Sequence, residues 1–368
     1  MFLFSMFVSG CSDSKDINEK TILTAVAMDK KGDDIILYVE IANIEGGKKS
    51  GDGGGSADNK FIYIKSHGKT IPEARENLNQ QLDKPAYLSA IRTLILTEEF
   101  AKEYLVEYLY RVRVDESYRK KTAIVITKED PEKLFKTINE KNISVGFSTE
   151  EMLMTLDEEG ESFLRTTSRI IENLSSSYTG LLLPSIGLQD KETLLVGYSV
   201  INNETIDGFI PIEESKGVIF LKASKPKFYY TVPYKDNKFT IEVALKNRKI
   251  KPQYDSGKIN FDLNFTFEAK LMYGDKKTPY KFDTAANAKV TKILTDMLKK
   301  EITNTVEQAQ KKYECDYLQF EDEFRIKFPV EYEDMNWEKE FSKAKFNTEV
   351  KVVLTSAWTM DYETGKIK

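Results

Sequence analysis

His67 is the single histidine of this chain, and it limits the catalytic and metal chemistry that the sequence can support. One histidine excludes the HExxH metal helix and zinc-finger spacings, which need a second histidine or a cysteine pair. A Ser-His-Asp triad would have to use His67, yet the GxSxG nucleophile elbow does not occur. Gly68-Lys69-Thr70 has the end of a P-loop, but Tyr63 occupies the position of its first glycine. We therefore interpret His67 as a residue with satisfied hydrogen bonds at the end of a strand.

Carboxylate pairs are the other candidates for acid–base chemistry. Asp157-Glu158-Glu159 and Glu213-Glu214 are examples, and glycosidases do use two carboxylates. Among 59 acidic residues, however, such pairs arise by chance and usually mark solvated surface. The sequence also contains no CxxC, EF-hand loop or GxGxxG. We predict that the protein is not an enzyme and uses no cofactor and no metal.

Cys11 is one of two cysteines and follows a short apolar run. Residues 1–8 contain one polar side chain, Ser5, and the small residues Ser9 and Gly10 precede the cysteine. A run of eight is far too short to span a bilayer, which takes about 20 residues. The order of apolar run, small residues, cysteine and polar segment resembles a bacterial lipoprotein processing site. We predict a signal and anchor segment over residues 1–18, cleavage before Cys11, and acyl chains on Cys11.

One feature of a secretory signal is missing, because no Lys or Arg precedes Cys11. The simplest explanation is a true start upstream of Met1. The alternative is an apolar N-terminal strand that buries Cys11 in the core. If Cys11 is acylated, Cys315 is a lone thiol, and we expect it to be a small buried hydrophobe.

Charge is nearly balanced, with 54 Lys and Arg against 59 Asp and Glu. This balance argues against nucleic acid as a partner, since nucleic-acid binding normally requires a basic domain or stripe. The stretch Arg111 to Lys121 is basic but is interrupted by Asp115 and Glu116, so we interpret it as a solvated helix end and turn.

The chain is long enough for two to three domains, because single cores usually stop growing near 250–300 residues. β-Forming residues dominate 21–29, 34–44, 60–66, 87–97 and 121–127. Helices are predicted from Thr70, where a capping box starts, to about Leu82, and after Thr97. A further helical stretch, 149–175, is broken near Gly160. This alternation predicts an N-terminal α/β domain over 19–190, with a further division near residue 145 compatible with the pattern.

The C-terminal region, 191–368, is predicted to be an α+β domain. Its strand-like runs indicate a largely antiparallel sheet, and apolar residues at spacings of three and four predict a long helix over about 285–313 that covers one face. Trp337 and Phe341 share one face of a short helix, which we expect to pack on the strand Thr348–Leu354. An exposed aromatic anchor for a partner is the alternative. The predicted strands are 193–201, 217–222, 228–232, 239–245, 259–272 and 348–354. The fold class is therefore α+β and multidomain, with mixed and antiparallel sheets flanked by helices.

Three stretches of this sequence resemble the Ger(x)C family, the C subunits of spore germinant receptors. In the first, Asp13, Ile17, Asn18 and Asp29 match the family pattern, whereas Ser12 and Ala27 replace its Trp and Gly. The second is the strand–turn–strand pattern of residues 196–209. The third covers 316–352, where Gln319 and Glu321 stand at positions that are usually glycine.

The resemblance implies a lipid-anchored, non-catalytic protein on the outer face of the spore inner membrane. It implies assembly with two integral membrane subunits, A and B, into a receptor that triggers germination in response to nutrients. The bilayer contact would be made through acylated Cys11. An extracytoplasmic solute-binding lipoprotein that captures a small nutrient is the alternative, and saturable nutrient binding by the isolated protein would favour it. A secreted hydrolase would instead show two convergent carboxylates in a deep cleft.

Overall fold

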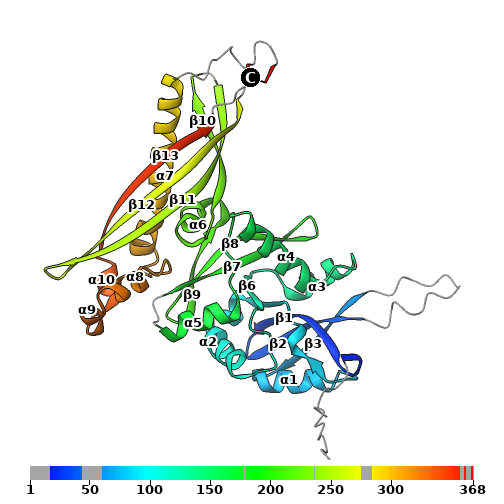
Figure 1. Cartoon of the computed structure of the whole chain (residues 1–368). Coiled ribbons are helices and arrows are strands. Elements are labelled where there is room, and N and C mark those ends of the chain that lie inside the picture. The colour runs from blue at the N-terminus through cyan, green and yellow to red at the C-terminus, as the bar shows by residue number, and fades with distance from the viewer. Residues whose placement is uncertain are drawn as a thin grey trace, which may run out of the picture.

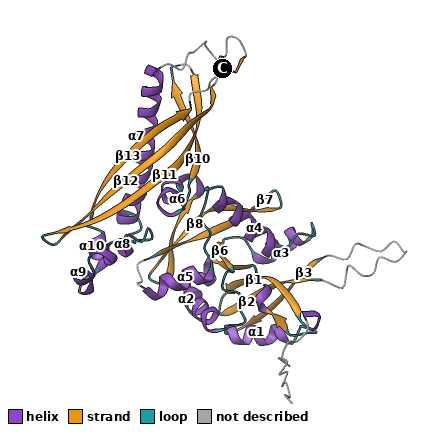
Figure 2. Ribbon diagram, in the orientation of Figure 1, coloured by secondary structure: helices purple, strands orange, loops and turns teal. Residues whose placement is uncertain are grey.

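The chain builds two main sheets, one in each half of the sequence, with helices against their faces (Figures 1 and 2). The structure is a computed structural model. It describes residues 17–43, 60–176, 180–235, 237–274, 284–356, 360–361 and 366–367. A short pair, β14 (Met360–Asp361) with β15 (Lys366–Ile367), lies near the end of the chain. The predicted α+β class, with mixed and antiparallel sheets flanked by helices, is confirmed.

The first sheet has the strand order β3-β2-β1-β5-β6-β7-β8-β9, with β4 beside β1. Its centre, β1-β5-β6-β7, is parallel, and antiparallel strands extend it on both sides. The strands are β1 (Thr21–Lys31), β2 (Asp34–Ala42), β3 (Phe61–Gly68), β4 (Ala86–Tyr87), β5 (Thr93–Thr97), β6 (Ala123–Thr127), β7 (Leu181–Gln189), β8 (Glu192–Asn202) and β9 (Thr205–Pro211).

Helices cover both faces of this sheet, as its parallel centre requires. One apolar core contains side chains of α1, α2 and α5, and the core on the other face contains those of α3 and α4. These helices are α1 (Ile71–Asn79), α2 (Glu98–Val114), α3 (Pro131–Asn139), α4 (Val145–Glu158) and α5 (Thr167–Ser176), with 3-10 turns η1 (Ile17–Glu19) and η3 (Leu88–Ala90).

The start of α1 shows how local sequence fixes an element. Thr70 Oγ1 accepts a hydrogen bond from the amide of Glu73 at 3.3 Å, and the Glu73 carboxylate accepts one from the amide of Lys69 at 2.8 Å. The first bond satisfies an amide of the first helical turn that has no intrahelical acceptor, and the second joins that turn to the residue before the N-cap Thr70. The predicted strand 87–97 is only partly correct, because η3 interrupts it and regular pairing resumes at Thr93.

The second sheet has the order β10-β11-β12-β13, and its last pair is parallel. The strands are β10 (Lys227–Tyr234), β11 (Asn237–Asp255), β12 (Lys258–Gly274) and β13 (Lys345–Ser356). The long helix α7 (Thr284–Lys311) lies along one face, and alternate residues of β12 are buried beneath it. The predicted stripe is confirmed: Val290, Leu294, Leu298, Ile302, Val306 and Ala309 are all buried. The short helices are α8 (Phe320–Lys327), α9 (Pro329–Glu333) and α10 (Trp337–Phe341).

One predicted strand of this half is wrong. Residues 217–222 form the helix α6 (Lys216–Lys222), preceded by the 3-10 turn η4 (Ile212–Glu214). Residues 217–221 are all buried, and a short, fully buried apolar run has no periodicity that separates a strand from a helix. Gly217 is required where α6 meets α7, because a Cβ there would lie 2.1 Å from Thr305 Oγ1.

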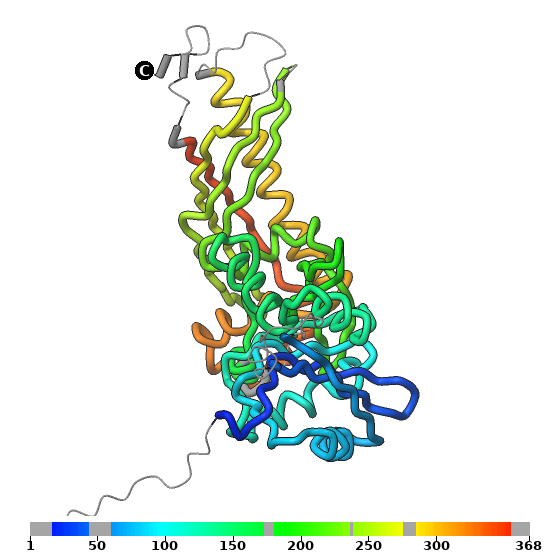
Figure 3. The backbone as a smooth tube through the Cα atoms, turned by 90° about the vertical axis from the view of Figure 1, so that its right-hand side faces the viewer, coloured from blue at the N-terminus to red at the C-terminus, as the bar shows by residue number. Residues whose placement is uncertain are grey.

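The two sheets share one continuous core. A single cluster of buried apolar residues runs from Ala25 of β1 through α6 and α7 to Phe341 of α10. The first sheet continues to Pro211, so a division after residue 190 falls in the turn between the paired strands β7 and β8. Figure 3 shows the second sheet and α7 extending as one long unit away from the first sheet.

Candidate functional site

Cys11 lies outside the described residues, which begin at Ile17. From there the chain passes through η1 into β1, and the Ile17 side chain is 52% exposed. Within the part of the chain that the structure describes, none of the helices combines the length and the apolar character needed to cross a bilayer.

His67 lies on β3 next to the strand end, where the sequence predicts it, and is exposed. Its carbonyl oxygen accepts a hydrogen bond from Asn77 Nδ2 at 2.8 Å. Glu213 and Glu214 lie on the surface at η4. Over the described ranges, no three His, Cys, Asp or Glu side chains gather as metal ligands would.

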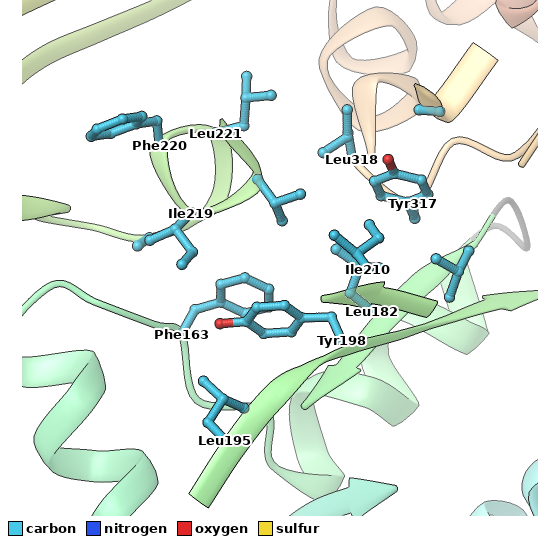
Figure 4. Close-up of a cluster of buried hydrophobic side chains, with 14 of the residues drawn as sticks. Phe163, Leu182, Leu195, Tyr198, Ile210, Ile219, Phe220, Leu221, Tyr317 and Leu318 are labelled. Atoms are coloured by element: carbon cyan, nitrogen blue, oxygen red, sulfur yellow. The ribbon is translucent and has the colours of Figure 1, made fainter. Parts of the chain in front are cut away.

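Several buried polar side chains lie where the two halves meet, among them Ser199, Ser215 and Asp316. We call this region the joint and define it as α6, the segment Tyr313–Gln319 and the strands β7 to β9. Figure 4 shows its apolar part, in which α6 packs above β8 and faces Tyr317 and Leu318. Phe163 and Tyr198 stack there with ring centroids 4.7 Å apart. Tyr313 links the segment Tyr313–Gln319 to β9, because its hydroxyl donates a hydrogen bond to the Phe209 carbonyl at 2.9 Å.

Lys222 ends α6 and points its ammonium group into the joint. Nζ donates to the Leu318 carbonyl at 3.0 Å and also to the side-chain oxygen of Gln319. The side chain as a whole is partly exposed, but protein atoms enclose the ammonium. Burial lowers the pKa of Lys222 to about 7, and the Arg165 guanidinium contributes to that fall. Arg248 closes the same helix end by donating to the Phe220 and Ala223 carbonyls at 2.8 and 3.0 Å.

Asp316 is a buried carboxylate at the start of α8. It accepts hydrogen bonds from the amides of Phe320 and Glu321 at 3.1 and 2.8 Å, and from Trp337 Nε1 at 3.0 Å. Burial raises the pKa of Asp316 to about 7, although these three hydrogen bonds oppose the shift. The carboxylate therefore joins the first turn of α8 to α10, where a negative group is also favoured by the helix dipole.

Gln319 lies between these two charged groups and has a left-handed backbone, with φ +63°. This conformation favours glycine, the residue usual at this position in the family that the sequence resembles. Here the glutamine side chain instead supplies an acceptor for Lys222.

Trp337 and Phe341 are buried, with 4% and 1% exposure, so the core interpretation is confirmed and that of an exposed anchor is wrong. Phe341 contacts Phe346 at the start of β13, with centroids 6.1 Å apart. Trp337 lies over Phe324 of α8 at 5.4 Å. The aromatic face thus packs on α8 and on β13 just before the predicted segment 348–354.

Cys315 is buried in the joint, as expected, with Sγ 3.7 Å from the Ile201 carbonyl oxygen. Burial raises the pKa of its thiol. A Cβ at Gly180 would lie 2.2 Å from this sulfur, so the backbone just before β7 passes close to Cys315. A protonated thiol in this setting packs as a hydrophobe and is a poor nucleophile.

Glu40 on β2 is a second buried carboxylate, and no motif in the sequence indicates it. Its oxygens accept from the side chains of Thr24, Asn139 and Ser144 at 2.5 to 2.6 Å. They also accept from the amides of Val145 and Gly146 at 2.7 and 3.2 Å, which fixes the start of α4. The available signal was one acidic residue, Glu40, inside the apolar run 35–42.

These groups hold neighbouring elements together. Lys222, Asp316 and Glu40 each have hydrogen-bond partners from a different element, which burial of a charge requires. The arrangement can fix the relative position of the two sheets.

Family models match both halves of the chain. One described as the spore germination protein N-terminal domain matches residues 13–188. Another, described as spore germination B3/GerAC like, C-terminal, matches residues 196–357.

Similar proteins occur in Bacillus subtilis strain 168. Spore germination protein B3 is 22% identical over 95% of this chain and 94% of its own length. Spore germination protein KC is 22% identical over 93% of this chain and 90% of its own. The crystal structure of the GerBC protein has the same fold, with a TM-score of 0.57, 17% identity, and coverage of 90% of this chain and 97% of that one.

Proposed function

This chain belongs to the spore germination B3/GerAC-like family, and from that membership we propose that it is the lipid-anchored C subunit of a germinant receptor. Its relatives are spore germination proteins, and the family is of a non-enzymatic kind. In this proposal the protein lies on the outer face of the spore inner membrane, held there by acyl chains on Cys11. It assembles with integral membrane A and B subunits and is needed for the response to nutrients.

The observation that carries the proposal is the extent of the family match. It begins at residue 13, two residues after Cys11, and continues with a short gap to residue 357. The apolar run and small residues before Cys11 support lipid attachment at that residue. The continuous core supports a role as a rigid binding component, because both halves would move as one body when a partner binds either.

Changing Cys11 to Ala tests the anchor. In spores that express the protein from its native gene, the variant should lose its fatty-acid label and leave the membrane fraction. Germination with the matching nutrient should fall with it. The Cys315→Ser variant is the matched control, since the buried Cys315 thiol is not the proposed acylation site. Retention in the membrane with an unchanged label would refute lipid attachment at Cys11.

Association with the membrane subunits needs its own experiment. Detergent extracts of spores should yield the A and B subunits together with the tagged wild-type chain. Failure of both to co-purify under conditions that preserve germinant response would contradict the assembly. Saturable nutrient binding by the isolated chain, measured by calorimetry, would instead favour a solute-binding lipoprotein.

A further inference from the structure

Three segments far apart in sequence meet at the edge of the first sheet where its parallel strands begin. Thr21, at the start of β1, donates through its amide to the Pro85 carbonyl at 2.9 Å. Ser89 Oγ donates to the Ser117 carbonyl at 2.7 Å, which links η3 to the loop after α2. We call residues 17–22, 83–92 and 110–122 the basic edge.

The basic edge carries an excess of positive charge on a chain whose net charge is -5. It contains eight Lys and Arg residues against four acidic residues, Glu19, Asp83, Asp115 and Glu116. Arg113, Lys120 and Lys121 are exposed. Part of the charge is used internally. Arg92 and Arg119 pair with Glu150 at 3.4 and 2.7 Å, and Arg111 pairs with Glu107 at 3.8 Å, and both of these carboxylates lie outside the edge. The stretch from Arg111 to Lys121, which looks interrupted in sequence, thus joins other cations in space.

Apolar side chains are exposed among these cations. Val114, the last residue of α2, is 75% exposed and follows Arg113. Tyr110, one helical turn earlier, is 46% exposed, and Ile17 is 52% exposed. The Lys20 ammonium lies over the Tyr87 ring, 4.9 Å from its centroid. Cations mixed with exposed aliphatic and aromatic side chains are the composition of surfaces that lie against lipid headgroups.

The short length of chain between Ile17 and Cys11 limits how far the basic edge can lie from the membrane. Five residues, 12–16, separate the two. A fully extended chain of that length spans about 20 Å. An acylated Cys11 would therefore keep Ile17, and the edge around it, within about 20 Å of the bilayer surface. Figure 3 shows the start of the described chain at the end of the molecule opposite the far end of α7.

We propose that the basic edge binds anionic lipid headgroups and sets the orientation of the protein on its membrane. The position of the membrane rests on the proposed acylation of Cys11, but the affinity of the edge for anionic lipid does not. Each Lys or Arg near such a surface strengthens binding by roughly fivefold, and the effect decays within a Debye length. Since a single acyl chain anchors only marginally, a basic surface beside the lipid adds the second contact that stable attachment requires.

Vesicle co-sedimentation tests the proposal on the full chain with Cys11→Ser, which removes the acylation site. Binding to phosphatidylcholine vesicles containing 30% phosphatidylglycerol is compared with binding to pure phosphatidylcholine, so that any contribution of the apolar N-terminal run cancels. The test variant is R113Q/K121Q. The matched control is K249Q/K251Q, two exposed lysines on β11 of the second sheet.

The parent should prefer the anionic vesicles and lose that preference in 0.5 M salt. R113Q/K121Q should bind them about 25-fold more weakly, at roughly fivefold per cation, with unchanged thermal melting, while the control variant binds like the parent. Equal binding to both vesicles, or equal losses in test and control variants, would overturn the proposal and leave the receptor assignment intact. Impaired germination of R113Q/K121Q spores with unchanged vesicle binding would also overturn it, and would assign the edge to a protein partner.

Discussion

Asp316 is the residue whose burial has the clearest thermodynamic consequence. An isolated aspartate titrates near pH 4, whereas burial raises the pKa of Asp316 to about 7. Between these values the folded state holds a proton that the unfolded state has released. Its contribution to stability is therefore fully present below about pH 4 and is lost as pH rises toward 7.

Asp316→Asn tests this linkage, because asparagine cannot ionise. Relative to the parent, the variant should gain stability as pH rises from 4 to 7, by up to about 4 kcal/mol for a shift of about three units. Urea unfolding at several pH values measures the difference. Asp334→Asn, at an exposed position between α9 and α10, is the control. A pH-independent difference between Asp316→Asn and the parent would refute the linkage.

Gln319 combines backbone strain with a useful side chain. Left-handed backbone costs a non-glycine residue about 1–2 kcal/mol, whereas a hydrogen bond to a charged group contributes about 1.5–3 kcal/mol. Gln319→Gly should therefore destabilise the parent by roughly 1 kcal/mol but stabilise a Lys222→Met background by about the same amount. A double-mutant cycle of urea unfolding measures both effects. Identical effects in the two backgrounds would show that the Lys222 contact contributes nothing.

These residues also show what sequence reasoning could not reach. Trp337 bonds to Asp316 and Lys222 bonds to Gln319, yet neither local pattern nor spacing in the sequence indicates these contacts. Cys315 was predicted to be buried because isolated thiols usually are. The acidic residue Glu40 stands out in an apolar strand of the sequence. The groups that donate hydrogen bonds to it lie 16 to 106 residues away, and the sequence does not indicate them.

At the scale of elements, hydrophobic periodicity predicts helices correctly, whereas short apolar runs do not distinguish a helix from a strand. The helix α7 was predicted to within about two residues because its stripe repeats over many turns. The capping box at Thr70 fixed the start of α1, although the helix ends at Asn79 instead of near Leu82. The segment 217–222 is buried on all sides, so its sequence shows no hydrophobic periodicity that would predict a helix. Its helical conformation fits the close packing of Gly217 against α7.

The packing of α10 is tested by changing Trp337. Trp337→Ala should cost about 3–5 kcal/mol, because it empties a space lined by α8. Trp337→Phe keeps a ring but removes the bond to Asp316, and should cost about 1–3 kcal/mol. Tyr273→Ala, at a position 58% exposed on β12, provides an aromatic control that should change little. Thermal melting ranks the three variants, and wild-type melting of Trp337→Ala would contradict its core role.

At the scale of the whole molecule, the shared core predicts that the two halves unfold together. Both tryptophans, Trp337 and Trp358, belong to the last 40 residues of the chain, so tryptophan fluorescence reports on the C-terminal half alone. Leu23 lies in the core on the other side of the first sheet and is fully buried. Leu23→Ala should cost about 2–5 kcal/mol and shift the fluorescence transition as far as the circular dichroism transition. Separate transitions, with fluorescence unmoved, would show that the halves are independent.

The length of α7 has a mechanical consequence. Its C-terminal turns pack on α6 at the joint, while its first turn lies at the opposite end of the second sheet (Figure 1). Twenty-eight helical residues measure about 42 Å. A tilt of about six degrees at the joint would therefore displace the far end by about 4 Å. Because the joint belongs to the continuous core, the second sheet and α7 should keep their angle to the first sheet, and only a loss of packing around Lys222 and Asp316 would let the tip move by this distance.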